Sequence, residues 1–117
     1  MKIYKTKFIS ILAKHLAKKL GGSLEQSSLN VFAQSLTPVV GMYEAKMREK
    51  DILDANDKIN IDNFSKSAND FFLTFPTINI PVAGAAVAIT KVDTVLFIKE
   101  LESKADIDEV IYLPCQN

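Results

Sequence analysis

Apolar residues recur at helical spacing over the first part of the chain. The spacing predicts an amphipathic helix over residues 2–20, because one side chain in every four falls on the same face. Gly21 and Gly22 follow directly and supply the left-handed backbone geometry with which helices commonly end. The apolar face consists of Tyr4, Phe8, Leu12, Leu16 and Leu20, flanked by Ile9 and Ile11.

Capping signals divide the next part of the chain into two more helices. Ser23 and Gln26 form a capping box, in which each side chain satisfies a free backbone amide of a new helix. Thr37 followed by Pro38 is typical of an N-cap and a first-turn proline, and so predicts the start of a third helix. The second helix is expected to run to about Leu36, and the third through Val39, Tyr43 and Met47 toward Leu53.

A polar connector is expected between Asp54 and Asn63. Asp62 or Asn63 can cap a fourth helix, which Pro76 ends. The apolar residues of this helix lie at helical spacing and would supply much of an aromatic core. They are Phe64, Ala68, Phe71, Phe72 and Phe75.

The C-terminal part has a different pattern. Small and β-branched residues from Thr77 to Ile89 predict a strand, with Ile78, Ile80 and Val82 alternating, and Pro81 confines that strand to an edge or a bulge. Thr90 and Asp93 form a second capping box, which starts a helix through Val95, Leu96, Ile98 and Leu101. After a turn at Asp106–Asp108, Val110 to Leu113 predict a short strand closed by Pro114.

An alternative is one long helix from Pro81 to Lys104, because alanine is the best helix former and proline suits a first turn. We prefer the strand, because it gives Thr90 a capping role. The resulting fold class is α+β and mainly helical, with four N-terminal helices followed by a small C-terminal β-α-β element. A chain of 117 residues has room for a single domain, residues 1–117.

Charge is divided unevenly, although the formal net charge is zero. Residues 1–22 contain six lysines and no acid, whereas the rest of the chain has eight basic and fourteen acidic side chains. A basic amphipathic helix can contact an acidic protein, nucleic-acid phosphates or an anionic membrane surface. We therefore predict Lys7, Lys14 and Lys18, on the polar face of the first helix, as partner-binding residues. The alternative is a terminal helix that packs its apolar stripe on the core and exposes its lysines to solvent alone.

Residues suited to catalysis are sparse. Four glycines leave no phosphate-binding loop of a known pattern, and no serine lies in a nucleophile elbow. His15 is the only histidine and is expected to pack its ring at the edge of the apolar face, and Cys115 is a tail residue without an assigned role. We predict no enzyme, no catalytic residue, no metal and no cofactor.

The run DANDKINIDNF resembles an EF-hand or dockerin calcium loop in its oxygen-bearing side chains and flanking helices. Such a loop needs glycine at its sixth position and a bidentate carboxylate at its twelfth. Counted from Asp54, these positions hold Ile59 and Ser65. We therefore interpret the run as a solvated turn rich in Asp and Asn.

The N-terminus does not have the pattern of a secretory signal peptide, and prolines interrupt the apolar region from Phe71 to Ile89. We expect no transmembrane segment and no membrane partner. The single Cys115 favours a reducing compartment. The expected location is cytoplasmic or within a virion-like assembly, and not secreted.

Residues 93–114, DTVLFIKELESKADIDEVIYLP, resemble in their helix-then-strand rhythm ferredoxin-like units and small domains of phage baseplate proteins. The resemblance covers about a fifth of the chain and identifies no family. It favours an assembly role.

The sequence therefore predicts a non-catalytic structural or assembly subunit that acts through a protein partner or self-association, as part of a phage- or virion-like particle or another multi-protein complex. The uneven charge supports this hypothesis, since it permits head-to-tail contacts between copies. The alternative is a small nucleic-acid-binding or regulatory module that uses the basic helix. Arginine and stacking aromatics are typical of such modules, whereas the only arginine, Arg48, lies outside that helix.

Overall fold

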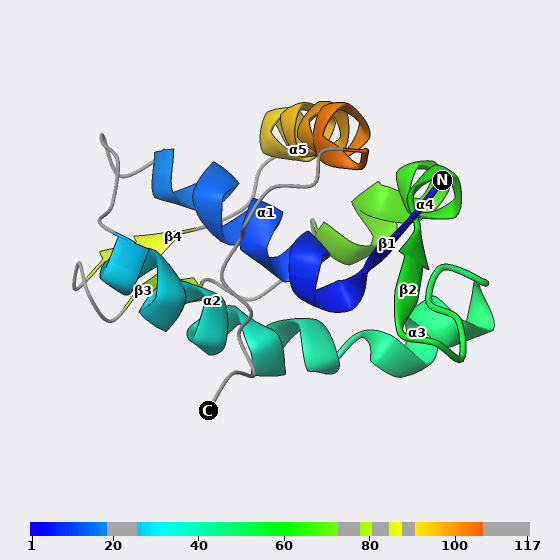
Figure 1. Cartoon of the computed structure of the whole chain (residues 1–117), viewed down its shortest axis with the longest axis horizontal. Helices are drawn as coiled ribbons and strands as arrows, with labels where there is room; N and C mark the ends of the chain where they lie inside the picture. Colours follow the sequence, from blue (N-terminus) through cyan, green and yellow to red (C-terminus); the bar gives the residue numbers. More distant parts are fainter. Residues whose placement is uncertain (19–25, 73–77, 81–84, 88–90, 107–117) are drawn as a thin grey trace.

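The computed structural model of the chain describes residues 1–18, 26–72, 78–80, 85–87 and 91–106. This part is mainly helical and contains small antiparallel sheets, which confirms a mainly helical α+β fold. Helix α1 runs through the middle, with α5 on one side and α2 on the other (Figure 1). The elements are β1 (Lys2–Tyr4), α1 (Lys5–Lys18), α2 (Gln26–Gly41), α3 (Glu44–Glu49), β2 (Lys58–Asn60), α4 (Ile61–Phe72), β3 (Ile78–Ile80), β4 (Ala85–Val87) and α5 (Lys91–Lys104).

Helix α1 is buried on most of its circumference instead of along a single stripe. Helices α2 and α5 cover opposite sides of it (Figure 1), as expected for a helix whose apolar residues exceed one face. The predicted start at residue 2 is wrong, because α1 begins at Lys5. The buried residues of α1 are Phe8, Ile9, Ser10, Ile11, Leu12, Ala13, His15, Leu16 and Ala17.

The first residues form strand β1, which pairs antiparallel with β2. Ile3 lies opposite Ile59, and both side chains are buried, whereas Tyr4 is exposed beside Lys58 of the neighbouring strand. The Lys58 ammonium group lies 4.9 Å from the centre of the Tyr4 ring. Strand β2 lies within the stretch expected to be a connector. A three-residue strand is too short for alternation to show in a sequence, and its partner lies far along the chain.

The predicted helix boundary at Thr37–Pro38 is also wrong, because α2 continues through both residues to Gly41. The Thr37 hydroxyl donates to the Ala33 carbonyl one turn back, at 3.1 Å, and so does not cap a new helix. The helix is retained past Pro38, and the N–H of Met42 donates to the Pro38 carbonyl at 3.2 Å. Proline removes only one backbone donor, and packing of the inner face of α2 outweighs that loss.

Asn60, and not Asp62 or Asn63, caps α4. Its side-chain oxygen accepts the N–H of Asn63 at 3.0 Å, which is the contact an N-cap residue makes with the third residue of a helix. The predicted core residues Phe64 and Ala68 are buried. Phe71 and Phe72 lie within α4, and the structure describes no more of their side chains.

Strands β3 and β4 form an antiparallel pair ahead of α5. The long helix from Pro81 to Lys104 is therefore wrong, because Ala85–Val87 is extended. The preferred strand is confirmed at Ile78–Ile80, and the predicted helix through Leu101 is confirmed as α5. Several predictions lie outside the described residues, namely those for Leu20, Gly21, Gly22, Ser23, Phe75, Pro76, Pro81, Val82, Thr90, Asp108, Cys115 and the strand at 110–113.

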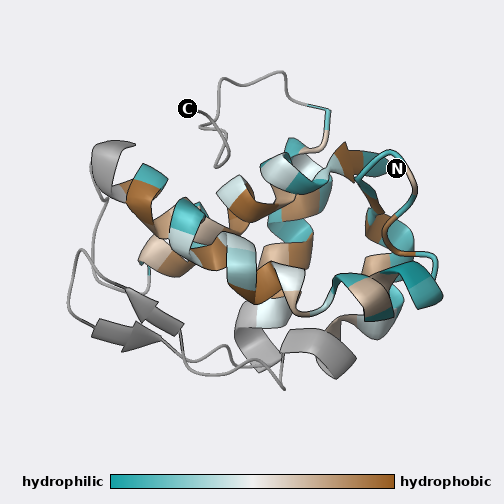
Figure 2. Cartoon of the chain, turned by 90° about the horizontal axis from the view of Figure 1, so that it is seen from below, coloured by the Kyte–Doolittle hydropathy of each residue, from teal (hydrophilic) through white to brown (hydrophobic). Residues whose placement is uncertain are grey.

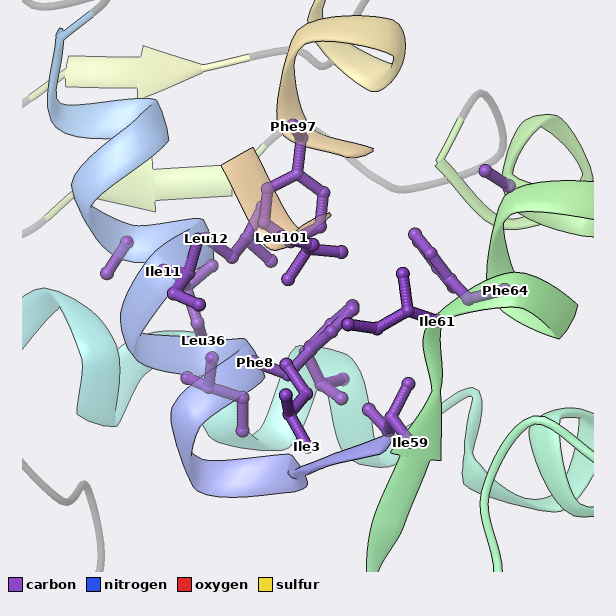
Figure 3. Packing of buried hydrophobic residues seen from close by; sticks show 14 of the residues in the cluster. Ile3, Phe8, Ile11, Leu12, Leu36, Ile59, Ile61, Phe64, Phe97 and Leu101 are labelled. Atoms are coloured by element: carbon purple, nitrogen blue, oxygen red, sulfur yellow. The ribbon is translucent and has the colours of Figure 1, made fainter. Parts of the chain in front are cut away.

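Three phenylalanine rings meet at the centre of the core (Figure 3). The centre of the Phe8 ring lies 5.1 Å from that of Phe64 and 5.3 Å from that of Phe97, and the rings are near perpendicular. The Phe64 and Phe97 rings are 6.2 Å apart in a similar arrangement. Edge-to-face contacts of this kind contribute about 0.5–1.5 kcal/mol each beyond the burial of apolar area. They join α1, α4 and α5.

Two neighbouring residues of α5 give a matched test of this packing. Phe97 is 1% exposed and Leu96 is 48% exposed. We expect Phe97→Ala to lower the free energy of unfolding by about 3–5 kcal/mol, because it leaves a cavity among the rings. We expect Leu96→Ala to change it by about 0.5 kcal/mol or less. Urea unfolding measures both values, and equal losses would show that α5 does not present Phe97 to the core.

Candidate functional site: the lysines of α1 and the outer face of α2

Two of the three lysines predicted to bind a partner contact helix α5 or the residue just beyond it in the same chain. The Lys7 ammonium group donates to the Ala105 carbonyl at 3.1 Å, just beyond the end of α5, where the helix dipole is negative. The Lys18 ammonium group lies 2.9 Å from a Glu100 carboxylate oxygen, although its side chain is largely exposed. Lys14 lies half-buried between them on α1 and also interacts within the chain. Their role in partner binding stays a prediction.

Other N-terminal charges are paired with acids of the body. The Lys2 ammonium group lies 3.1 Å from a carboxylate oxygen of Asp54, and Lys5 pairs with Glu44. The N-terminal amine lies 3.3 Å from Asp62. Exposed pairs such as these contribute little stability each. They nevertheless show that much of the uneven charge along the sequence is balanced within one copy of the fold.

His15, Lys18 and Glu100 form a cluster between α1 and α5. The His15 ring is only 6% exposed and packs against Phe97 at 5.8 Å between ring centres. Its Nδ1 atom lies 3.1 Å from the Glu100 oxygen that also contacts Lys18. The predicted packing of the His15 ring is confirmed. Its partner was not predicted from the sequence, because Glu100 comes from a distant helix.

Opposing effects act on the Glu100 carboxylate. Burial alone would raise its pKa, but the hydrogen bonds from His15 and Lys18 outweigh burial, and the pKa lies below its ordinary value. The carboxylate is therefore held in its charged form by groups on the neighbouring helix. The contacts of Glu100 with His15 and Lys18 thereby hold α1 and α5 together.

The same geometry does not suit catalysis. The second nitrogen of His15, Nε2, and the second carboxylate oxygen of Glu100 are both buried, and neither has a hydrogen-bond partner. A catalytic imidazole must reach a proton of its substrate within hydrogen-bond distance. Nε2 of His15 and the second oxygen of Glu100 are enclosed by protein, so neither of these two atoms is presented to a solute, and the pair joins two helices.

The Asp-rich loop is closed by its own backbone. One oxygen of Asp54 accepts the N–H groups of Asn56 and Lys58, at 2.8 and 3.0 Å, as the predicted Asx-rich turn requires. The N–H of Lys58 and then the Lys2 side chain hold the pKa of Asp54 below its ordinary value. Arg48 donates to the Asp54 carbonyl and to Asp57. Within the described ranges, no three His, Cys, Asp or Glu side chains gather to hold a metal ion.

Helix α2 carries a surface that was not predicted from the sequence. Its core side is formed by Phe32, Ala33, Leu36 and Val40, all buried. The opposite side, which we name the α2 outer face, faces solvent and lies on the side of the molecule viewed in Figure 2. It comprises Val31, Gln34, Pro38 and Gly41, together with Met42 just beyond the helix.

The α2 outer face contains no charge. Val31 is 40% exposed and Met42 is 69% exposed. The outer side of a solvated helix is normally charged or polar. Val95 and Leu96 of α5 are exposed too, but Lys99 and Glu102 are exposed beside them. This absence of charge could be read from the sequence, because residues 26–43 include no charged side chain in a chain that is 24% charged.

Comparison of the chain with protein families, with curated proteins and with solved structures finds no match. In the part of the chain that the structure describes, no helix has the length and apolar character needed to cross a membrane.

The contacts of Glu100 with His15 and Lys18 predict that the stability of the fold depends on pH. A carboxylate whose pKa is lower in the folded than in the unfolded state stabilises the fold above its ordinary value of 4.5, and this contribution is lost as the pH falls through the folded value. We expect Glu100→Gln to lower the free energy of unfolding by about 1 kcal/mol at pH 6. The difference from the wild type should shrink as the pH falls to about 3.

Urea unfolding at a series of pH values measures this difference. Glu102→Gln removes an exposed carboxylate from the same helix and serves as the control. If the difference in free energy of unfolding between Glu100→Gln and the wild type stays constant down to about pH 3, the charged Glu100 carboxylate does not stabilise the contact between α1 and α5.

Proposed function

We propose that the chain is a non-catalytic subunit that acts through protein–protein contacts, within a phage- or virion-like particle or another multi-protein complex. The observation that carries this proposal is the uncharged α2 outer face. Charged residues are depleted at the core of protein interfaces, whereas Met and aromatic residues are enriched there. A solvent-facing helix side with Val31 and Met42 and no charge has the composition of an interface and not that of an ordinary surface.

The lysines of α1 support the nucleic-acid alternative less well than the α2 outer face supports a protein partner. Binding of phosphates by Lys7 or Lys18 would compete with their contacts to Ala105 and Glu100, and so would weaken the attachment of α5. Covering Val31 and Met42 breaks no ion pair, because both side chains are apolar. A partner that covers Val31 and Met42 therefore displaces no ion pair of these side chains, whereas one that binds Lys7 or Lys18 displaces their contacts with Ala105 and Glu100.

Site-specific photo-crosslinking in cells of the source organism tests the proposal. A photo-reactive amino acid that replaces Val31 should yield covalent adducts with protein, since this side chain would lie in an interface. The same amino acid at Ser103, an exposed position on α5, is the matched control and should yield few adducts. Mass spectrometry identifies what is attached.

The other outcomes of this experiment would count against the proposal. Equal yields at the two positions, or no protein adduct at position 31, would refute an interface on α2. Adducts with nucleic acid at a third position, Lys18, would instead favour the nucleic-acid module. That module further predicts DNA or RNA binding that weakens steeply with salt and with the change of Lys7, Lys14 and Lys18 to Glu.

A further inference from the structure

We propose that the outer edge of strand β1 is a docking site for an extended, acidic segment of a partner protein, which pairs with β1 as an added strand. The inference rests on the proposed function, because its occupant is part of a protein partner, but it concerns a surface other than the α2 outer face. Strand β1 lies beside β2 at one end of the molecule (Figure 1). Addition of a strand to an exposed sheet edge is a common form of peptide recognition.

The hydrogen bonds between β1 and β2 determine which backbone groups of β1 face outward. The N–H of Lys5 donates to the Asp57 carbonyl at 2.9 Å, and the N–H of Ile61 donates to the Met1 carbonyl at 2.9 Å. In an antiparallel pair, the backbone groups of successive residues point alternately toward the neighbouring strand and away from it. The odd-numbered residues at this end of the chain therefore face β2, and the even-numbered residues face away from it.

Two residues of β1 thus form its outer edge. The N–H and carbonyl of Lys2 and the N–H of Tyr4 point away from β2. Both residues are exposed, Tyr4 at 58%. Among the described elements, β1 packs mainly against β2 and against α1, which continues from it. An unpaired edge of this kind can serve as a template for another strand. An added antiparallel strand would form three main-chain hydrogen bonds with these groups.

The opposite edge of this small sheet is already paired. The segment 52–54 lies against β2 there, and the N–H of Asn60 donates to the Ile52 carbonyl at 2.7 Å. The Arg48 guanidinium donates to the Asp54 carbonyl at 2.7 Å. The β1 side is therefore the side on which the sheet can be extended.

The charge beside the β1 edge favours an acidic segment. The Lys58 ammonium group lies over the Tyr4 ring, and no carboxylate of the described part of the chain forms an ion pair with it. Asp54 does not supply one, because its oxygens accept two backbone N–H groups and the Lys2 ammonium group. Side chains directly opposite on paired strands lie on the same face. A carboxylate opposite Tyr4 on the added strand would therefore lie beside the ring and pair with Lys58.

The same charges disfavour a second copy in this position. Pairing of two β1 edges would place Lys2 and Lys58 of both copies on one face of the joined sheet, where like charges are destabilising. Lysines at exposed sheet edges prevent self-association in many proteins in this way. The edge therefore favours an acidic strand over the same edge of another copy.

NMR titration with capped peptides of about five residues tests the inference. The probe alternates glutamate and threonine, and its counterpart alternates lysine and threonine. We expect the glutamate peptide to shift the amide signal of Tyr4 with a dissociation constant of about 1 mM, because a few main-chain hydrogen bonds and one exposed ion pair support only weak binding. The lysine peptide should bind about threefold more weakly or less. Lys58→Gln should raise the dissociation constant of the glutamate peptide about threefold. The control Lys66→Gln, which removes an exposed cation from α4, should leave it unchanged.

Methylation of the peptide backbone separates strand pairing from attraction of charge alone. In the paired peptide, the N–H groups of the glutamates point at β1 and those of the threonines point away. N-methylation of the glutamates should therefore abolish the shift of the Tyr4 signal, whereas N-methylation of the threonines should preserve it.

Three results would overturn the docking site. They are the lack of a saturable shift of Tyr4 at about 10 mM glutamate peptide, equal binding of the glutamate and lysine peptides, and equal effects of the two methylated peptides. The photo-crosslinks at position 31 test the proposed function on a different surface. Loss of peptide binding at β1 with adducts retained at position 31 would overturn this inference alone, and the reverse result would overturn only the interface on α2.

Discussion

The contact among Phe8, Phe64 and Phe97 is the interaction on which the rest of the structure depends. It joins helices from the beginning, the middle and the end of the described chain. With Phe97 directed inward, Leu101 lies one turn further along α5 and also enters the core, while Glu100 is carried to the flank that faces His15. The packing of one aromatic ring thereby sets which polar groups of α5 meet α1.

This arrangement changes how the lysines near the N-terminus are interpreted. A helix with lysines on one side suggests a peripheral element with a free cationic face. In the fold, α1 is instead central, and Lys7 and Lys18 extend past the core to reach α5. Long lysine stems allow this, because their methylene groups can lie along apolar surface while the ammonium group finds an acceptor. The charge that looked available for a partner is used largely within the molecule.

Helix α2 contrasts with α1, because no partner-binding residue was predicted on it and its outer side is exposed. Its inner residues pack on α1, whereas Val31 and Met42 on its outer side are exposed. Solubility would favour charged residues at these exposed positions. The protein–protein contact proposed for this side would account for its lack of charge.

Local patterns in the sequence determined a large part of this protein. Helical spacing located the first helix, α4 and α5, and the alternation at Ile78–Ile80 predicted a strand. These features follow from interactions between residues close in the chain, such as capping and the recurrence of apolar side chains. The absence of charge in α2 was likewise readable, although its position on the outside was not.

Only the tertiary structure decided the remaining features. β1 exists because Ile3 pairs with Ile59, and α2 continues past Pro38 because its inner face is packed. Glu100 binds His15 and Lys18 because three distant aromatic rings bring α5 onto α1. Each of these depends on contacts between residues far apart in the sequence, whose free energies can outweigh the local preferences of a turn, a proline or a short strand.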